Sequence, residues 1–473
     1  MKFNKTKIIA TIGPATYSKE VLDELVSEGT NVCRLNFSHG SYEEYDQVIR
    51  AIRDISKEKN INIGILADLQ GPKLRIGEIE GGSIDLKEGE RIIITSKELK
   101  GSNKKLYVNY PNLSSELKEN DPILINDGKI RLRVQETHPE EVTAIIEQGG
   151  ELTSKKGVNL PNTGLSLPSL TEKDLNDLDF ALKNQIEWIA LSFVRSSQDI
   201  KDLKSLISKK RKKAKVIAKI EKPQALDDIE SIIKVADGIM VARGDLGVEV
   251  PLHSLPLIQK RIVAKSRIHS KPVIIATQMM ESMMQNLTPS RAEVNDVANA
   301  VMDGADAVML SGETSVGKYP VEVIKTIYKI IDNAETYEDL YYKMNVLNLS
   351  SNRDISDSIC QNAIKLARDT KAKAIVTMSF SGYTGFKISS FRPKANTFVF
   401  TANRPILNML SLLWGVRGFY YNKFVSTDDT INDIMGKLEN EGLINKDDLI
   451  INIASMPIRG KGKSNMLKLS RVE

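Results

Sequence analysis

The chain of 473 residues contains only two cysteines, Cys33 and Cys360, which lie far apart in the sequence. Two cysteines so placed can build neither a disulfide framework nor a cysteine-based metal site, and they are typical of a reducing compartment. No apolar run approaches the roughly 20 residues that a membrane-spanning helix needs. The first residues, MKFNKTKIIATIGP, are basic but include only a short apolar run, so they do not predict a signal peptide. We therefore expect a cytoplasmic protein with no membrane partner.

Aromatic residues are also few, at 5%, and the net charge is only +5, with both signs spread along the chain. The densest basic run, KKRKKAK at residues 209–215, has no aromatic residue between its cations, and an apolar run follows it at once. This pattern favours the solvated end of a helix over a nucleic-acid site. With 41% hydrophobic and 27% charged residues, the composition is that of a globular protein without a nucleic-acid partner.

Short apolar runs followed by polar or glycine-rich clusters recur along the chain, and helix-like segments such as VLDELVSEG separate most of them. The runs cover residues 7–16, 31–40, 62–71, 187–196, 215–224, 237–247, 271–282 and 306–317. Apolar strands that alternate with helices predict a parallel sheet covered on both faces. An open doubly wound sheet would alternate too, but it usually has fewer strands. We therefore predict an α/β protein built on a closed (β/α)₈ TIM barrel.

A long stretch of different texture separates the third run from the fourth. It consists of short β-branched segments between turns, and Asp127-Gly128 predicts a hairpin. We predict an all-β lid domain at residues 71–168, inserted into a barrel made of residues 1–70 and 169–343. Beyond a polar linker, helices and strands alternate again and predict a small α/β domain at residues 344–473.

Polar residues follow most of the predicted barrel strands at their carboxyl ends, where barrel active sites form. They are Arg34, Asn36, Ser38, His39, Asp68, Lys219, Glu221, Arg243, Asp245, Thr277, Ser311 and Glu313. A capped loop or a surface ion pair would explain any one of them. Their recurrence at the same end of most strands favours a functional site.

The stretch KIEKP places Lys219 and Glu221 on the same side of a strand, pointing into the barrel mouth. Glu221 and Asp245 end adjacent strands, and two such carboxylates suit a hard divalent cation that also binds substrate oxygens. Gly244 would let the backbone approach a ligand closely. With Lys219 and Arg34, this site would surround a small polyanion, as phosphoryl transfer requires.

A second phosphate motif must be weighed against this site. Residues 312–318, GETSVGK, follow an apolar strand and nearly match the loop G-x-x-x-x-G-K-[ST]. Tyr319 stands where the motif needs a hydroxyl for Mg²⁺, and Pro320 follows it. We therefore predict no such loop here.

Over essentially its whole length the chain resembles the pyruvate kinase family. The matching motifs are KIIATIGPAT, CRLNFSHG, KKGVNLP, KIEKPQALDDIE, GIMVARGDLGVE, PVIIATQMMESM and AVMLSGETSVGKYP, in the family's order. The resemblance implies transfer of a phosphoryl group from phosphoenolpyruvate to ADP, giving pyruvate and ATP in the last step of glycolysis. It also implies a requirement for Mg²⁺ or Mn²⁺ and assembly into a homotetramer.

The resemblance also implies roles for single residues. Glu221 and Asp245 would hold the divalent ion, and Lys219 and Arg34 would bind the phosphoryl group. Thr277, with Gly244 and Asp245, would contact the substrate, and Thr277 would lie near the enolate face that gains a proton. The matching positions on the nucleotide side are Pro14, Asn36, His39, Arg75 and Lys156.

The stretch LADLQGPKLR departs from the pattern of many family members, which read D-T-K-G-P-E here and bind K⁺. Residues matching their K⁺ ligands are Asn36, Ser38 and Asp68, with the backbone at Leu69. Here Lys73 replaces the glutamate, as in the branch that works without K⁺. The Lys73 ammonium would stand in for K⁺, with the three side chains as its ligands or as scaffold. The alternative is a solvent-facing lysine in a turn.

In the C-terminal region, SFSGYTG lies at the position of the family's allosteric phosphate loop. Hydroxyls and glycines that open a helix suit a phosphate, although a capped helix start explains them equally well. The candidate effector residues are Ser379, Ser381, Gly382, Tyr383 and Thr384. The loop does not say which phosphorylated effector binds, if any.

Two other functions stay open. One is another barrel enzyme that binds Mg²⁺-phosphoenolpyruvate or pyruvate enolate, such as a carbon–carbon lyase. The lid and Lys219 disfavour it, since a lyase needs no cover for ADP. The other is a catalytically silent homologue that only binds effector. The joint presence of Arg34, Lys219, Glu221, Asp245 and Thr277 disfavours that.

Overall fold

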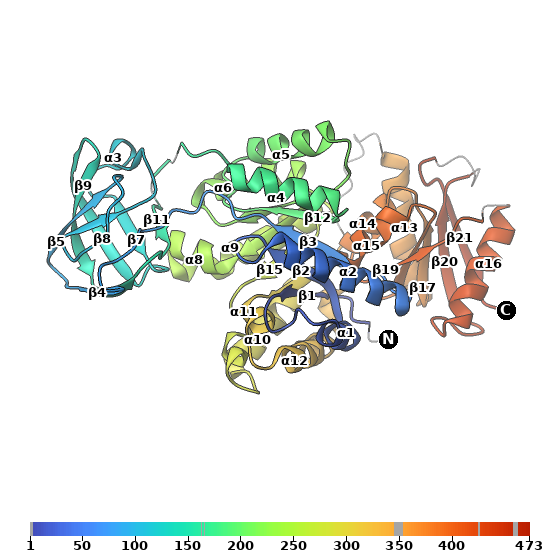
Figure 1. Ribbon diagram of the computed structural model, residues 1–473. Helices are drawn as coiled ribbons and strands as arrows, with labels where there is room; N and C mark the ends of the chain where they lie inside the picture. The colour runs from blue at the N-terminus through green and yellow to red at the C-terminus, as the bar shows by residue number, and fades with distance from the viewer. Residues whose placement is uncertain (1–2, 162, 165, 345–352, 424–425, 457–461) are drawn as a thin grey trace.

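The computed structural model describes residues 3–161, 163–164, 166–344, 353–423, 426–456 and 462–473 (Figure 1). A closed barrel lies in the middle, a β-domain lies beyond one end of it, and an α/β domain packs at the other end. This architecture confirms the fold class predicted from the sequence. The described helices are all too short or too polar to cross a bilayer.

The barrel closes through eight parallel strands in the order β1-β16-β15-β14-β13-β12-β3-β2. They are β1 (Lys7–Ile12), β2 (Thr30–Asn36), β3 (Gly64–Asp68), β12 (Trp188–Leu191), β13 (Lys215–Ile220), β14 (Gly238–Ala242), β15 (Val273–Ala276) and β16 (Ala307–Leu310). Most of their residues are buried on both faces, which explains their near-continuous apolar sequences.

Helices cover the outside of the barrel (Figure 1). They are α1 (Lys19–Glu28), α2 (Tyr42–Glu58), α4 (Glu172–Lys183), α5 (Ser197–Lys209), α6 (Pro223–Asp227), α7 (Ile229–Val235), α8 (Arg243–Glu249), α9 (Leu255–Ile268), α10 (Arg291–Asp303), α11 (Gly312–Ser315) and α12 (Pro320–Ala334). Short 3₁₀ turns add η1 (Leu252–Ser254), η2 (Glu281–Met284) and η3 (Glu338–Leu340). Thr171 caps α4, since its hydroxyl accepts from Asp174 N while the Asp174 carboxylate accepts from Thr171 N.

The β-domain forms a six-stranded sheet in the order β11-β7-β8-β9-β5-β6 and a two-stranded pair, β10-β4. Its elements are β4 (Ser83–Leu86), β5 (Arg91–Thr95), β6 (Lys105–Tyr107), α3 (Leu113–Glu116), β7 (Pro122–Ile125), β8 (Ile130–His138), β9 (Glu141–Gln148), β10 (Gly150–Thr153) and β11 (Val158–Asn159). The hairpin predicted at Asp127-Gly128 joins β7 to β8, and both residues have positive φ. One short helix, α3, departs from the all-β prediction.

The C-terminal domain is a five-stranded sheet in the order β19-β18-β17-β20-β21, parallel except for β21. Its elements are α13 (Asp354–Thr370), β17 (Ala374–Met378), α14 (Tyr383–Ser390), β18 (Asn396–Thr401), α15 (Arg404–Met409), η4 (Leu410–Leu412), β19 (Val416–Tyr420), α16 (Thr427–Asn440), β20 (Leu449–Ala454) and β21 (Met466–Arg471). The polar linker predicted before it falls largely on residues 345–352, outside the described part.

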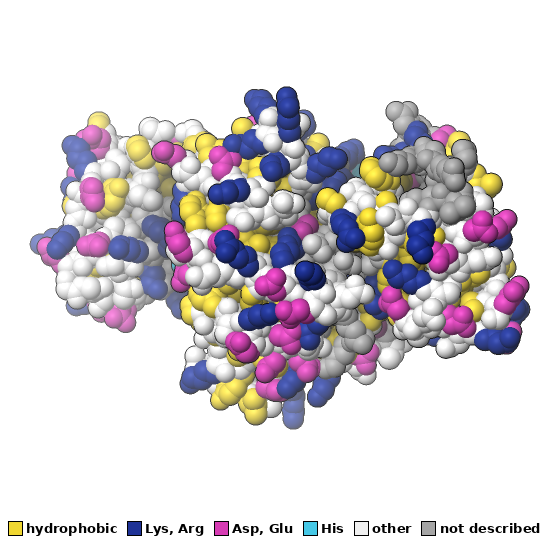
Figure 2. Space-filling model, turned by 45° about the vertical axis from the view of Figure 1, so that its right-hand side comes forward, with side chains coloured by type: hydrophobic (Ala, Val, Ile, Leu, Met, Phe, Trp, Pro, Cys, Tyr) yellow, Lys and Arg dark blue, Asp and Glu magenta, His cyan; other side chains and the backbone are white. Residues whose placement is uncertain are grey.

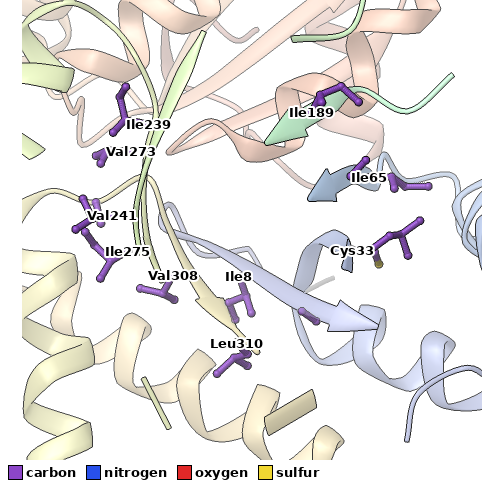
Figure 3. Packing of buried hydrophobic residues seen from close by; sticks show 14 of the residues in the cluster. Ile8, Cys33, Ile65, Ile189, Ile239, Val241, Val273, Ile275, Val308 and Leu310 are labelled. Carbon is purple, nitrogen blue, oxygen red and sulfur yellow. The ribbon is translucent and has the colours of Figure 1, made fainter. Parts of the chain in front are cut away.

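Successive strand residues enter two different cores because side chains alternate across a strand. Ile8, Cys33 and Ile65 belong to the core between strands and covering helices (Figure 3). Ile9 and Trp188 belong to a second core inside the barrel, which continues into the C-terminal domain. Trp188 Nε1 donates to Met409 O at 3.2 Å. The C-terminal domain therefore closes the amino ends of the barrel strands, and the site must lie at the other end.

A buried ion pair joins the same two domains. Arg392, 1% exposed, donates from Nη2 to Asp306 Oδ2 at 2.8 Å and to Gly304 O at 2.7 Å. Asp306 Oδ2 also accepts from Val273 N at 3.0 Å. The pair therefore fixes the domain contact to two barrel strands.

Replacing Arg392 with Met should lower the free energy of unfolding by about 3–5 kcal/mol, because it leaves the Asp306 carboxylate buried without its cation. Lys394→Met is the matched control, since Lys394 pairs with Glu338 on the surface, and it should cost less than about 1 kcal/mol. Urea denaturation of both variants measures the difference. Equal losses in the two variants would contradict this account of the interface.

Candidate active site

The carboxyl ends of β2, β3, β12 and β13, which are neighbours in the barrel, bring four predicted side chains together. Asp68 lies at their centre, 2% exposed. Its Oδ2 accepts from Arg34 Nε at 2.7 Å, and its Oδ1 lies 3.1 Å from Lys219 Nζ. Burial would raise the pKa of the Asp68 carboxyl, but the charges of Lys219 and Arg34 hold that pKa below its ordinary value.

Arg34 is fixed at both ends of its guanidinium. Nη2 lies 2.7 Å from Asp68 Oδ2, and Nη1 donates to Thr11 Oγ1 at 2.8 Å. Thr11 Oγ1 in turn donates to Leu310 O at 2.7 Å. Arg34 is thus held by β1 and β3, its neighbours in the barrel, before any ligand binds.

Lys219 lies between two carboxylates and a hydroxyl. Its Nζ lies 2.9 Å from Glu221 Oε1 and donates to Ser192 Oγ at 2.7 Å, in addition to its contact with Asp68. Burial acts to lower the pKa of Lys219, but Asp68 and Glu221 outweigh it and raise the pKa above its ordinary value. Lys219 is therefore an ammonium ion at neutral pH.

Glu221 is buried, at 1% exposure, and only one of its oxygens is fully used. Oε2 accepts from Phe193 N at 2.8 Å, whereas Oε1 has the contact with Lys219 but no well-aligned hydrogen bond. Burial and the nearby charge of Asp245 raise the pKa of Glu221, although Lys219 opposes them. A cation bound beside Glu221 would therefore stabilise its ionised carboxylate.

Asp245 lies in the first turn of α8, and its exposed fraction of 31% leaves it open to the barrel mouth. No group of three or more His, Cys, Asp and Glu residues suited to a metal is found in the described part of the chain. The predicted site needs only two carboxylates, because Mg²⁺ usually binds one or two carboxylates together with substrate oxygens.

Lys73 contacts Asp245 rather than the residues that match the family's K⁺ ligands. Its Nζ lies 3.6 Å from Asp245 Oδ1, and Lys73 is 32% exposed. Asp68 is already occupied by Arg34 and Lys219, while Asn36 Oδ1 accepts from Ser38 N at 3.3 Å. Of the two predicted roles for Asn36, Ser38 and Asp68, these contacts favour scaffold over ligands of the Lys73 ammonium. Leu69 is buried, and its carbonyl accepts from Ser192 Oγ.

Thr277 directly follows β15 and lies in the left-handed region, with φ of 68°, which is rare for a β-branched residue. Its Oγ1 accepts from Gly244 N at 2.7 Å and donates to Ala276 O at 2.6 Å. A Cβ at Gly244 would lie 3.4 Å from Thr277 Oγ1, so glycine permits this close approach. Such strain at a strand end is typical of functional sites.

Arg243 holds this strained turn in place, a role that the sequence analysis did not assign to it. Its Nη2 donates to Thr277 O at 2.7 Å and to Gln278 O at 3.2 Å, and its Nη1 donates to Asp296 at 2.7 Å. Thr11 and Ser192, which position Arg34 and Lys219, were also missed. Their signal was the same strand-end position, but an alcohol there is too common to single out.

The residues predicted on the nucleotide side divide between barrel and lid. Pro14 and His39 are exposed on barrel loops, and the His39 carbonyl accepts from the Tyr45 hydroxyl. Arg75 and Lys156 belong to the base of the lid, where Arg75 donates to Lys155 O at 3.0 Å and Lys156 O accepts from Ile76 N at 2.9 Å. No described contact joins the two groups directly.

Four of the five predicted effector residues, all except Gly382, line a cavity of about 410 Å³ in the C-terminal domain. Gly382, with φ of 80°, begins α14, and its N–H donates to Ser379 Oγ at 3.1 Å. Ser381, Tyr383 and Thr384 follow in the same wall. The side chains of Arg353 and Lys463 also line this cavity.

Comparison with known proteins places this geometry in a family. The family model described as "Pyruvate kinase, barrel domain" matches residues 3–324, and the one described as "Pyruvate kinase, alpha/beta domain" matches residues 357–470. The chain belongs to the pyruvate kinase family.

Relatives in this family cover nearly the whole chain. The pyruvate kinase of Staphylococcus epidermidis is 40% identical over 99% of this chain and 80% of its own length. That of Corynebacterium glutamicum is 40% identical over 98% of this chain and 96% of its own. A crystal structure of a pyruvate kinase from Cryptosporidium parvum aligns with a TM-score of 0.93 at 33% identity, over 99% of this chain and 96% of that one. Likeness to a pyruvate kinase therefore extends through lid, barrel and C-terminal domain.

Replacing Arg243 with Gln should loosen the Thr277 turn, because two carbonyls lose a charged donor. Charged hydrogen bonds contribute about 1.5–3 kcal/mol each, so we expect the amides of residues 276–281 to exchange with deuterium at least about tenfold faster. Hydrogen–deuterium exchange read by mass spectrometry measures this directly. Arg291→Gln, at the exposed start of α10, is the control and should leave the segment unchanged. Unaltered exchange in the Arg243 variant would refute the positioning role.

Proposed function

We propose that this chain is a phosphotransferase that moves a phosphoryl group from phosphoenolpyruvate to ADP, giving pyruvate and ATP. The observation that carries the proposal is the pair of buried cations, Arg34 and Lys219, fixed on one carboxylate at the open end of the barrel. Relatives at 40% identity bear the name pyruvate kinase. We also propose a cytoplasmic homotetramer, by analogy with the family.

Arg34 and Lys219 act on the phosphoryl group through charge that is already in place. Phosphoryl transfer builds negative charge on the transferring oxygens, and fixed cations stabilise it without reorganisation. Asp68 prevents either side chain from turning away, while the raised pKa of Lys219 keeps its proton on the ammonium. Arg34 offers a planar fork to the oxygens, and Lys219 offers a point charge.

Glu221 and Asp245 fit a bound Mg²⁺ or Mn²⁺. Glu221 Oε1 is buried without an aligned donor, and burial raises the pKa of this carboxyl, so a cation would relieve both costs. When bound, the ion would supply Lewis-acid polarisation of substrate oxygens. Glu221 has one positive neighbour, Lys219, and one negative neighbour, Asp245. Their charges offset each other, so the chain supplies little net positive charge beside Glu221.

Thr277 and Gly244 would bind the carboxylate end of the substrate. Thr277 Oγ1 is fixed by Gly244 N and Ala276 O, so its position does not depend on the ligand. Gly244 has no side chain that would keep a ligand away from the start of α8. Thr277 stays a candidate for the face on which the enolate gains its proton.

The lid would cover the nucleotide bound near Pro14, Asn36, His39, Arg75 and Lys156. Contacts beside that of Lys73 with Asp245 already join it to the barrel: Asn159 Nδ2 donates to Glu249 Oε1 at 2.7 Å, and Arg195 Nη2 donates to Leu167 O at 2.7 Å. Figure 1 shows α8 next to β11 at this junction. Closing such a lid excludes water that would otherwise accept the phosphoryl group.

Lys73 supports a reaction that does not require K⁺. Its ammonium reaches the same carboxylate, Asp245, that would hold the divalent ion, so a positive charge is built into the site. The family's glutamate at this position would instead add a negative charge. Lys73 does not contact the residues that match the family's K⁺ ligands. It would therefore replace K⁺ by its charge and not by binding the same ligands.

The carbon–carbon lyase and the silent effector-binding homologue are disfavoured, since relatives that are 40% identical over nearly the whole chain are pyruvate kinases. A phosphorylated effector is proposed for the cavity at Ser379, Ser381, Gly382, Tyr383 and Thr384. The helix start and the lining cations Arg353 and Lys463 support an anion there.

Pyruvate formation from phosphoenolpyruvate and ADP with Mg²⁺ tests the reaction and the K⁺ claim together. In a buffer with tetramethylammonium as the sole monovalent cation, wild type should show near-full activity, and added K⁺ should change it less than about twofold. Lys73→Glu should lose at least about tenfold without K⁺ and recover with it, because one fixed charge is worth roughly this much in a partly exposed site. A K⁺ requirement in wild type would contradict the Lys73 proposal, and the absence of pyruvate would contradict the reaction.

Thermal melting tests the divalent site without an activity readout. Mg²⁺ should raise the melting temperature of wild type, because binding stabilises the folded state by mass action. Glu221→Gln should lose this response. Burial raises the pKa of Glu221, so without metal the folded state loses stability as the pH rises through that pKa and the carboxyl ionises. The Glu221→Gln variant cannot ionise there. Without metal it should therefore be at least as stable as wild type at pH 8. The exposed control Glu281→Gln should respond to Mg²⁺ as wild type does. A wild-type response in Glu221→Gln would show that Glu221 does not hold the ion.

A further inference from the structure

The base of the lid is a neck made of two antiparallel segments, residues 73–77 and 155–159. Arg75 pairs with Gly157, and backbone hydrogen bonds of 2.9 to 3.1 Å flank this pair. At the end of the neck, Asn159 belongs to β11, which pairs with β7 in the six-stranded sheet. Hydrogen bonds therefore join the neck and the sheet, so a contact at Asn159 acts on the whole lid.

Glu249, the last residue of α8, holds the end of this neck. Its side chain is fully buried, and Oε1 accepts from Asn159 Nδ2 at 2.7 Å and from Lys222 Nζ at 2.5 Å. Lys222 belongs to the barrel, where it lies in the loop that follows β13. One carboxylate oxygen thus joins a side chain of the lid to a side chain of the barrel.

Stability alone does not explain why this carboxylate is buried. Glu249 Oε2 is enclosed without a hydrogen-bond partner among the described residues, which is unfavourable. Figure 2 shows acidic and basic side chains mixed over the solvent-facing surface, whereas the pair of Glu249 and Lys222 lies inside the junction, with side-chain exposures of 0% and 12%. A buried ion pair adds little net stability compared with apolar residues, so we attribute this pair to the geometry that it fixes.

Two further contacts seat the lid on the same helix. Lys73 Nζ, in the neck, lies 3.6 Å from Asp245 Oδ1 in the first turn of α8. The β7–β8 hairpin lies against Val248, since a Cβ at Gly128 would come within 3.5 Å of Val248 Cγ1. The lid therefore rests along α8, as Figure 1 shows for β11. Of the three helix residues in contact with it, Glu249 alone is buried.

We propose that Glu249 is a positioning residue for the nucleotide side of the site. By holding Asn159 it sets the angle of the neck on α8, and with it the positions of Arg75 and Lys156, which the neck carries. Arg75 and Lys156 face a nucleotide only if the proposed function holds, so this consequence rests on that function. The placement of the lid does not. Glu249 acts through the neck and is not a catalytic residue.

Spin-label distances between lid and barrel test this role without any reaction. Labels at Lys104→Cys in the lid and Ser205→Cys on α5 occupy exposed positions. Cys33 and Cys360 are buried and should not react with the label. Labelled chains are mixed with an excess of unlabelled chains, so that pulsed electron paramagnetic resonance reads only distances within one chain.

Asn159→Ala removes the donor on the lid and leaves the pair of Glu249 and Lys222 intact, so the barrel should fold as in wild type. The distance distribution should broaden, because the lid loses a hydrogen bond to a charged group. Asn103→Ala, at an exposed position in the same domain, is the matched control and should leave the distribution unchanged.

A second variant replaces the buried pair by apolar side chains, Glu249→Met with Lys222→Met, which leaves no unpaired charge behind. It should broaden the distribution as Asn159→Ala does. A wild-type distribution in both variants would overturn the proposal.

Steady-state kinetics test the consequence for the nucleotide. Asn159→Ala should raise KM for ADP at least about fivefold, and KM for phosphoenolpyruvate less than about twofold, because the lost hydrogen bond positions only the lid. An equal rise in both constants would overturn the assignment to the nucleotide side. If wild type forms no pyruvate, the proposed reaction is wrong, and the spin-label distances still decide the role of Glu249.

Discussion

Asp68 ends β3 with its carboxylate between the Arg34 guanidinium and the Lys219 ammonium, and the rest of the site is arranged around this contact. One buried anion here orients two cations and keeps both charged. Thr11 and Ser192 complete their coordination from neighbouring strands. Glu221 then faces Lys219 with an oxygen that lacks an aligned donor. The positive charge needed for phosphoryl transfer thus comes from buried groups that stabilise one another. The same arrangement leaves one oxygen of Glu221 without an aligned donor.

The two ends of the barrel differ because different domains cover them. Trp188 and the Arg392–Asp306 pair fix the C-terminal domain to the amino ends of the strands. Gly244 and the strained backbone of Thr277 lie at the other end, to which the lid is joined.

Sequence patterns predicted the barrel because each strand is buried on both faces and therefore reads as an apolar run. The same reasoning placed Arg34, Asp68, Lys219 and Glu221 at one end, since carboxyl ends of parallel strands meet there. The contact of Lys73 with Asp245 could not be predicted, because it depends on how the lid sits over the barrel. Nor could the role of Arg243, which follows from the left-handed backbone of Thr277.

The role of Lys219 as the fixed charge on the transferring phosphoryl group is the central claim. The most direct measurement is the turnover number of Lys219→Met, set beside its affinity for phosphoenolpyruvate in the presence of Mg²⁺. Loss of one preorganised donor typically costs about 10²–10³ in turnover, so we expect at least that loss with binding reduced far less. Turnover close to that of wild type would contradict the account.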